Sequence, residues 1–259
     1  MPSLKAYNAQ VHYEIHGDET APVVILSHSL GVDGDMWRPQ VSSFAERFRV
    51  VRYDTRGHGQ TTASPGPYSV DLLGRDVIAL LDELRLERVH FCGLSMGGAV
   101  GMWLGVNAPE RLNRLVLSNT AAKLGTAEGW KSRIESVKKS GMQAVAPGII
   151  ERWFTAGFRE SHREIVSSTQ KTIEETDPGG YVACCEALSE MDLRSTISEI
   201  TVPTLVVVGA HDPVTTPADG RFLTEKIRGA RYVELDAAHL SNIEDAQHFS
   251  AAVAGFLSA

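Results

Sequence analysis

The sequence predicts an α/β fold in which a mostly parallel sheet is flanked by helices and carries one helical insertion. Apolar runs of strand length alternate with segments of helical periodicity, and such repeated strand–helix units require right-handed crossovers and a mostly parallel sheet. The alternation lapses between about residues 121 and 194, where the pattern is helical and punctuated by glycine. A chain of 259 residues, 43% of them hydrophobic, is long enough to bury the core of one large domain.

The elements expected before the insertion follow one another in a regular order. Residues 4–17 alternate in polarity around an Asn8–Ala9 turn, which predicts two short strands. Residues 22–28, PVVILSH, form a continuous apolar run, which is typical of a strand buried on both faces. The further expected elements are a helix near 36–48, a strand at 50–54, a helix over 69–84, a strand ending at Gly93, a helix over 96–106 and a strand at 115–118.

The same alternation resumes after the insertion. The expected elements are a strand at 203–209, a helix near 218–227, a strand at 231–235 and a last helix with Ala246, Phe249, Val253 and Phe256 on one face. The simplest domain organisation is a core formed by residues 1–120 and 195–259. Residues 121–194 then form a helical cap, or lid, inserted between strands 6 and 7 of the sheet.

Composition and charge exclude several classes of function. The net charge of −7 and the lack of a basic stripe argue against nucleic acid as a partner. The N-terminus does not resemble a secretory signal, and no apolar stretch is long enough to span a bilayer, so we expect a cytoplasmic protein without a membrane partner. The three cysteines, Cys92, Cys184 and Cys185, lack zinc-like spacing and are expected to be reduced and buried.

One hydroxyl lies among glycines where a predicted strand passes into a predicted helix, in the stretch FCGLSMGGA at residues 91–99. Glycine suits a tight turn because it lacks a Cβ, so the stretch could be only a structural turn. The alternative is a catalytic turn, in which Gly93 and Gly97 remove side chains that would collide and the Ser95 hydroxyl is pushed into a cleft. The remaining loops at the same edge of the sheet decide between the two interpretations.

A serine nucleophile needs a base within hydrogen-bond reach and a third group that orients the base. Loops at the carboxyl ends of parallel strands surround a common crevice, so the predicted loops at 28–31, 93–97, 209–213 and 237–239 should converge. Asp212 and His239 lie in the last two of these loops. We therefore predict a catalytic triad of Ser95, Asp212 and His239.

Other histidines are weaker candidates for the base. His211 is adjacent to Asp212, but neighbours at a strand end tend to point to opposite sides. His248 lies within a predicted helix and His16 in the early hairpin. Asp54 and Arg56, in the segment YDTRGHG, are expected to form hydrogen bonds that structure a loop rather than to act in catalysis.

Attack on a carbonyl develops negative charge on its oxygen, which two backbone N–H groups can stabilise by several kcal/mol. Met96 follows the predicted nucleophile at the start of a helix and supplies one of these groups. Leu30, in the loop after the third strand, is expected to supply the other. These backbone groups would form the oxyanion hole.

Several of these motifs resemble the α/β-hydrolase fold family. They are the elbow GLSMG, the segment YDTRGHG at residues 53–59, and the late segments GAHD and AAHLSNIE. Within this family the chain is most similar to the 3-oxoadipate enol-lactonases of the β-ketoadipate pathway, through residues 237–244 and the stretch GTAEGW with Arg133. Many relatives carry glycines where this chain has Ala237 and Ala238, and this departure favours the lactonase subgroup.

The resemblance implies a substrate and a mode of binding. An enol-lactone with an acetate side chain is a small anion, so a net acidic protein needs a local cation to hold it. We expect Arg133 to bind the carboxylate and Trp130 to pack on the ring, because residues three apart in a helix are neighbours. The rival cations are Lys123, Lys131 and Arg152.

The expected reaction is hydrolysis of the lactone through an acyl-enzyme on Ser95, which requires no metal or organic cofactor. Two alternatives are an esterase or a perhydrolase of the haloperoxidase type, acting on another small ester or lactone. A third is a ligand sensor that retains the fold without catalysis. Dehalogenase and epoxide hydrolase chemistry is not expected, because in both the position of Ser95 is occupied by aspartate.

Overall fold

The computed structural model describes residues 3–6 and 8–259. In these ranges eight strands form one sheet, in the order β1-β2-β4-β3-β5-β6-β7-β8. The first hairpin is antiparallel, β2 pairs antiparallel with β4, and every later pairing is parallel. The strands are β1 (Ser3–Ala6), β2 (Ala9–His16), β3 (Val23–Ser27), β4 (Arg49–Tyr53), β5 (Val89–Leu94), β6 (Leu112–Ser118), β7 (Thr204–Gly209) and β8 (Arg231–Leu235). The expected mostly parallel sheet is thereby confirmed.

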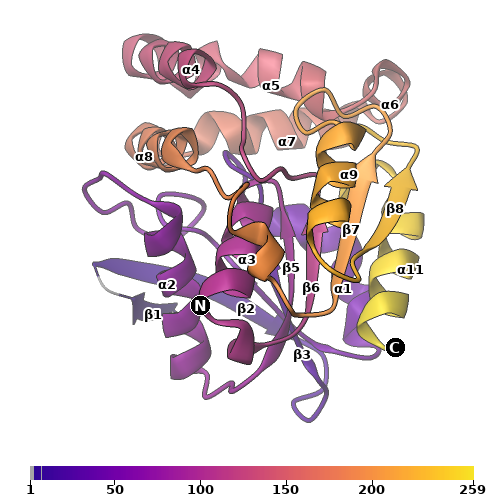
Figure 1. Ribbon diagram of the computed structural model, residues 1–259. Helices are drawn as coiled ribbons and strands as arrows, with labels where there is room; N and C mark the ends of the chain where they lie inside the picture. Colours follow the sequence, from indigo (N-terminus) through magenta and orange to yellow (C-terminus); the bar gives the residue numbers. More distant parts are fainter. Residues whose placement is uncertain (1–2, 7) are drawn as a thin grey trace.

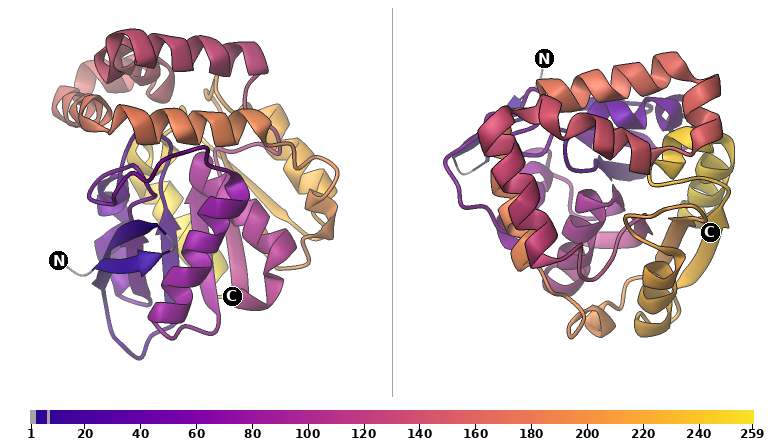
Figure 2. Two further views of the ribbon diagram at one scale, coloured as in Figure 1. Left: turned by 90° about the vertical axis from the view of Figure 1, so that its left-hand side faces the viewer. Right: turned by 90° about the horizontal axis from the view of Figure 1, so that it is seen from above.

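Helices cover both faces of this sheet, as Figures 1 and 2 show. On one face lie α2 (Val70–Glu83), α3 (Met96–Asn107) and α9 (Pro217–Lys226), and on the other lie α1 (Arg38–Ala45) and α11 (Ala246–Leu257). A short helix, α10 (Ser241–Glu244), precedes α11. The central strands β3, β5 and β7, and β6 from Leu115 on, are almost wholly buried between these layers, because their side chains are mostly apolar on both faces.

The segment between β6 and β7 contains helices and no strand in the described chain. The inserted helices are α4 (Ala127–Ser140), α5 (Ala146–Trp153), α6 (Ala156–Ser161), α7 (Arg163–Glu175) and α8 (Pro178–Glu190). They lie above the carboxyl ends of the strands in Figure 1. A hydrogen bond of 2.8 Å from Leu193 N–H to the Ala122 carbonyl joins the two ends of the insertion.

The inserted helices rest closely on a loop of the sheet domain. Gly180, at the start of α8, lies back to back with Gly57, and a Cβ on either residue would lie 2.4 Å from the Cα of the other. Beside this contact the Thr176 hydroxyl donates to the Gly31 carbonyl at 3.1 Å. This approach is possible only because both facing residues are glycine.

Two elements differ most from their expected bounds. The helix expected near 36–48 is a 3₁₀ turn at Gly34–Trp37 followed by α1, whose first turn accommodates Pro39 because that position needs no N–H partner. Strand β6 begins at Leu112, three residues before the expected start, because its first part pairs with β5 alone and includes polar residues. Of the expected turn at Asn8–Ala9, Asn8 lies in a turn and Ala9 is already the first residue of β2, whereas Tyr7 lies outside the described residues.

No helix within the described ranges is both long enough and apolar enough to cross a membrane.

Candidate active site

Ser95 lies in a sharp turn between β5 and α3. Its φ of 58° and ψ of −112° are unusual for a residue with a side chain, and such strain persists only where the surroundings hold it in place. The Ser95 N–H donates to the Ser118 carbonyl at 2.9 Å, and the Gly97 N–H donates to the His28 carbonyl at 3.1 Å. These two hydrogen bonds fix the turn on the neighbouring strand ends.

The two glycines beside Ser95 are required by this geometry. A Cβ on Gly93 would lie 2.1 Å from the carbonyl oxygen of Gly97, and a Cβ on Gly97 would lie 2.2 Å from that of Ser27. Any side chain at either position would therefore push the turn away from the sheet. The turn is thus built for close backbone approach on both sides of the hydroxyl.

His239 and Asp212 form a buried hydrogen-bonded pair. His239 Nδ1 lies 2.8 Å from Asp212 Oδ2, and the two residues are 1% and 3% exposed. Asp212 also accepts hydrogen bonds from the Val214 and Thr215 amides and from the Thr215 hydroxyl. Burial by itself would raise the pKa of Asp212, but the attraction and hydrogen bond of His239, with the other donors, lower that pKa to about 2.

Asn119, directly after β6, is a residue of this network that sequence reasoning missed. Its side-chain amide donates to Asp212 Oδ2 at 3.0 Å and to the Ala238 carbonyl at 3.3 Å. Its carbonyl oxygen accepts from the hydroxyls of Ser118 and Ser241. The residue is fully buried and has a φ of 42°. Its position at the carboxyl end of a strand, the edge where the other candidates lie, was the available signal.

Two backbone amides near Ser95 remain available for an oxyanion. Among the described residues, no partner accepts from the N–H of Leu30 or of Met96, whereas the next amide along the chain is occupied in both cases. The Gly31 N–H donates to His58 Nε2 at 2.9 Å, and the Gly97 N–H donates to the carbonyl of residue 28. The amides of Leu30 and Met96, which the sequence analysis proposed for the oxyanion hole, are therefore free of hydrogen-bond acceptors among the described residues.

Buried neutral histidines hold the loop that carries Leu30. His28 Nε2 accepts from the Thr55 N–H at 2.8 Å, so its other ring nitrogen carries the proton and donates to the Ser29 carbonyl. Burial lowers the pKa of His28, and burial together with the nearby His28 lowers the pKa of His58 to about 3. Both rings therefore stay neutral and act as fixed hydrogen-bond acceptors for backbone amides.

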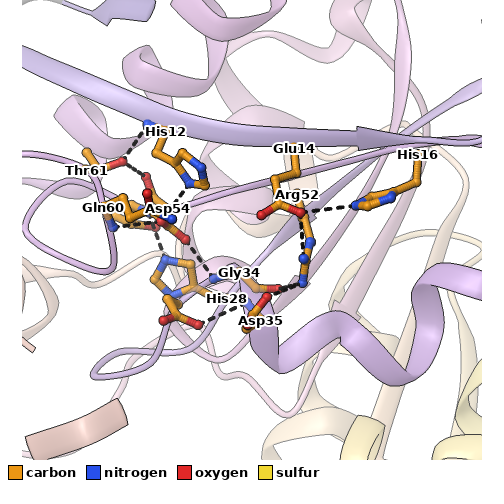
Figure 3. Close-up of polar contacts among 12 residues, drawn as sticks. His12, Glu14, His16, His28, Gly34, Asp35, Arg52, Asp54, Gln60 and Thr61 are labelled. Atoms are coloured by element: carbon orange, nitrogen blue, oxygen red, sulfur yellow. Dashed lines mark hydrogen bonds and ion pairs between the residues drawn. The ribbon is translucent and has the colours of Figure 1, made fainter. Parts of the chain in front are cut away.

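Asp54 lies in a separate polar cluster, shown in Figure 3. It accepts hydrogen bonds from the Gly34 amide at 2.8 Å, the Gln60 amide at 2.9 Å and His12 Nδ1 at 3.1 Å. Arg56 forms a buried bidentate pair with Asp76. Neither Asp54 nor Arg56 lines the cavity at Ser95, so their contacts are those of loop structure, as expected.

Ser95 and His239 line one cavity of about 350 Å³. The inserted helices contribute Trp130 and Arg133 from α4, and Arg152 and Trp153 from α5. Leu30, whose amide is free, also lines the cavity. Among the residues that line it, none is acidic, so the cavity presents two guanidinium groups without an opposing carboxylate.

Trp130 and Arg133 are neighbours on α4, as the sequence spacing predicts. The Arg133 guanidinium lies 5.1 Å from the centre of the Trp130 ring, and the Trp130 Nε1–H donates to the Leu124 carbonyl at 2.6 Å. This hydrogen bond fixes the ring at the wall of the cavity. A cation stacked on a fixed aromatic face has a defined position.

The rival cations differ in their surroundings. Lys123 pairs with Asp192 at 3.6 Å, and exposed Lys131 does not line the cavity. Arg152 lies at the rim, where partial burial of its guanidinium and the charge of Arg133 lower its pKa. Of these three residues, only Arg152 joins Arg133 in the cavity.

The other candidate histidines lie elsewhere. Exposed His211 pairs with Asp236 at 2.8 Å, and exposed His248 pairs with Asp245 at 2.8 Å. His16, the last residue of β2, lies 3.2 Å from Glu14 (Figure 3). None of these three lines the cavity at Ser95.

Comparison with known proteins places this architecture in a family. The family profile of the alpha/beta hydrolase fold matches residues 22–246, which is most of the chain. The chain belongs to the α/β-hydrolase fold family. This α/β-hydrolase is 44% identical over 251 residues to the 3-oxoadipate enol-lactonase 2 of Acinetobacter baylyi, with 97% of this chain and 94% of the relative covered.

Two further similarities extend over nearly the whole α/β-hydrolase. The 3-oxoadipate enol-lactonase 1 of Acinetobacter baylyi is 39% identical over 244 residues, which cover 94% of this chain and 91% of the relative. The crystal structure of the enol-lactonase from Burkholderia xenovorans LB400 superimposes with a TM-score of 0.99. That structure is 44% identical, and all of both chains is covered.

Proposed function

We propose that this α/β-hydrolase is a carboxylic ester hydrolase that opens 3-oxoadipate enol-lactone to 3-oxoadipate. The observation that carries the proposal is the cavity, where Ser95 and His239 meet two arginines and no acidic side chain. Such a cavity selects a small ester that carries a negative charge. The similarity to enol-lactonases over nearly the full length supports the same substrate.

In the first half of the reaction Ser95 Oγ attacks the lactone carbonyl while His239 takes the hydroxyl proton. Asp212, ionised because of its low pKa, accepts the Nδ1–H of His239 and so directs Nε2 toward the serine. The carbonyl oxygen gains negative charge, and the free amides of Leu30 and Met96 stabilise it. The ring C–O bond then breaks, and the enol oxygen, which stays attached to the acyl chain, takes the proton from His239. The enol then becomes the ketone.

In the second half, water attacks the acyl-enzyme. His239 takes a proton from the water, whose oxygen attacks the acyl carbon. The second tetrahedral intermediate then breaks, His239 returns the proton to Ser95 Oγ, and the carboxylic acid is released. An enolate leaves more readily than an alkoxide, so the oxyanion donors matter more in this reaction than protonation of the leaving group. The residues that we assign to catalysis are Ser95, His239 and Asp212.

We assign recognition of the substrate to α4 and the start of the insertion. Arg133 would bind the acetate carboxylate by two parallel hydrogen bonds, and Trp130 would pack against the lactone ring. Arg152 adds a second positive charge at the rim. The arginines belong to the inserted helices and the triad belongs to the sheet domain. The substrate would therefore lie between the inserted helices and the sheet domain.

The separation of the binding arginines from the triad suggests a domain organisation. We assign residues 1–120 and 195–259 to the core domain and residues 121–194 to a helical cap that acts as a lid over the cavity. The hydrogen bond between Leu193 and Ala122 closes this segment at its base. The cap would then supply recognition and exclude water, while the core supplies the reacting groups.

The test follows the loss of ultraviolet absorbance of the enol-lactone with the wild type and Ser95→Ala. We expect rapid turnover that disappears in the variant. Arg133→Ala should raise KM about 10- to 100-fold with a smaller change in kcat, because a charged hydrogen-bonded pair is lost on binding. Lys131→Ala removes a neighbouring cation outside the cavity and should leave both constants unchanged.

The opposite results have distinct meanings. A wild type that cleaves p-nitrophenyl acetate but not the enol-lactone would retain the serine mechanism and reject the substrate. A KM for the lactone that is the same in Arg133→Ala and in the wild type would reject the assigned role of that arginine.

A further inference from the structure

The peptide backbone on both sides of His239 is held by groups that belong to other elements. This histidine loop, residues 236–240, joins β8 to α10. The Ala238 N–H donates to Glu244 Oε2 at 2.9 Å, and the Leu240 N–H donates to the Trp153 carbonyl at 3.1 Å. The residue before the histidine is therefore held by a side chain, and the residue after it by the end of α5.

Glu244 also contacts the insertion. Its Oε1 accepts the Thr155 N–H at 3.1 Å and, in a short hydrogen bond, the Thr155 hydroxyl. Thr155 precedes α6 and lies two residues after Trp153. One carboxylate thus joins the amide next to His239 to the same short segment, residues 153–155, that holds Leu240.

The aromatic ring of this segment completes the contact. The Trp153 ring lies over the His239 ring, with centroids 5.9 Å apart and planes inclined by 34°. Trp153 is 5% exposed and His239 is 1% exposed. The imidazole is therefore confined by a ring from the insertion on one side and by its hydrogen bond to Asp212.

We propose that Glu244 is a positioning residue, which fixes the histidine loop to residues 153–155 and so holds the His239 imidazole between Trp153 and Asp212. This inference rests on the proposed role of His239 as the base. It makes the insertion part of the apparatus that positions the base, in addition to its role in substrate recognition. The segment at 153–155 cannot move away without releasing the loop.

A carboxylate suits this role better than any other side chain of similar size. Its two oxygens only accept, and here they meet two backbone N–H groups and one hydroxyl. A glutamine of the same shape would place an NH₂ group opposite one of these donors. Glu244→Gln therefore breaks one side of the connection while it preserves volume and packing.

The experiment measures kcat and KM for Glu244→Gln with the enol-lactone and with p-nitrophenyl acetate. We expect kcat to fall about 10- to 100-fold for both substrates, because small displacements of a catalytic group have effects of this size. KM for the lactone should stay within about twofold, because the arginines of the cavity are untouched. Asp245→Asn alters the adjacent carboxylate, which pairs with exposed His248, and should leave kcat unchanged.

Thr155 provides a second, milder test should Glu244→Gln fail to fold. Thr155→Val removes one donor to Glu244 and should lower kcat about 3- to 10-fold. Thr155→Ser retains the hydroxyl, so its kcat should equal that of the wild type. In a folded double variant of Glu244→Gln with Thr155→Val, kcat should be no lower than in Glu244→Gln, because both changes act through one contact.

A kcat within twofold of the wild type in folded Glu244→Gln, or in Thr155→Val if the former does not fold, would overturn the inference. A rise in KM with kcat unchanged would do so as well, since it would assign these residues to substrate binding. The p-nitrophenyl substrate separates this result from the proposed function, because its cleavage reports on His239 even if the lactone is not the substrate.

Discussion

Acidification should destabilise this protein through His58, and the size of the effect follows from its surroundings. His58 is 1% exposed, and burial first and the neighbouring His28 second lower its pKa from 6.5 to about 3. Between these two values the unfolded chain binds a proton that the folded chain does not. Stability is therefore retained above pH 6.5 and falls as the pH drops below it.

The magnitude can be worked out for a change from pH 7.5 to pH 5.5. At the lower pH protonation stabilises the unfolded histidine by roughly 1 to 2 kcal/mol, whereas at the higher pH it contributes almost nothing. His58 alone should therefore lower the free energy of unfolding by roughly 1 to 2 kcal/mol. The folded ring remains neutral at pH 5.5, so its hydrogen bond to Gly31, and with it the loop that carries Leu30, should persist.

Urea unfolding of the wild type and of His58→Gln at both pH values tests this prediction. The glutamine oxygen can accept the Gly31 N–H but does not titrate, so on acidification the free energy of unfolding of the variant should fall by roughly 1 to 2 kcal/mol less than that of the wild type. His28, whose pKa is also lowered, is present in both proteins and cancels in the difference. An equal loss of stability in the two proteins would refute the reasoning that His58 is buried in its neutral form.

Three further predictions follow from other contacts. Asn119→Ala should lower kcat about tenfold, since it removes one donor to the Asp212 carboxylate, and steady-state kinetics at several pH values would show an effect on kcat rather than KM. Gly180→Ala should lower the free energy of unfolding by about 1–3 kcal/mol in urea titrations, because its Cβ meets the facing glycine, whereas Gly148→Ala has open space and should not destabilise. Asp76→Asn should cost about 3–5 kcal/mol in the same assay, because Arg56 would stay buried without its partner.

Much of the fold could be predicted because strands and helices differ in local periodicity. Strand β8 has the predicted bounds, and β7 begins one residue after its predicted start. The prediction was less accurate for β6, where Asn113 lies at a shift in register and Arg114 pairs only with β5, so that polar side chains are tolerated at both positions. Local pattern shows how buried a strand is on average, whereas its ends depend on which neighbours pair with it.

The sequence by itself determined the order of elements and the few residues whose chemistry is distinctive. A serine between glycines, and an aspartate and a histidine each after a strand, stand out because parallel strands bring their carboxyl ends to one edge. For the same reason Asn119 should also have been considered there, but an amide has no chemistry that selects it from sequence alone.

Only the tertiary structure decided which groups meet. The contact of Glu244 with Thr155 joins residues 89 positions apart, and the connection of Asn119 to Asp212 joins residues 93 positions apart. Which of the candidate cations line the cavity was likewise decided by the packing of α4 and α5 around it. These contacts depend on how layers of the fold pack against one another, and no local pattern in a chain encodes the distance between two segments that pack only when it folds.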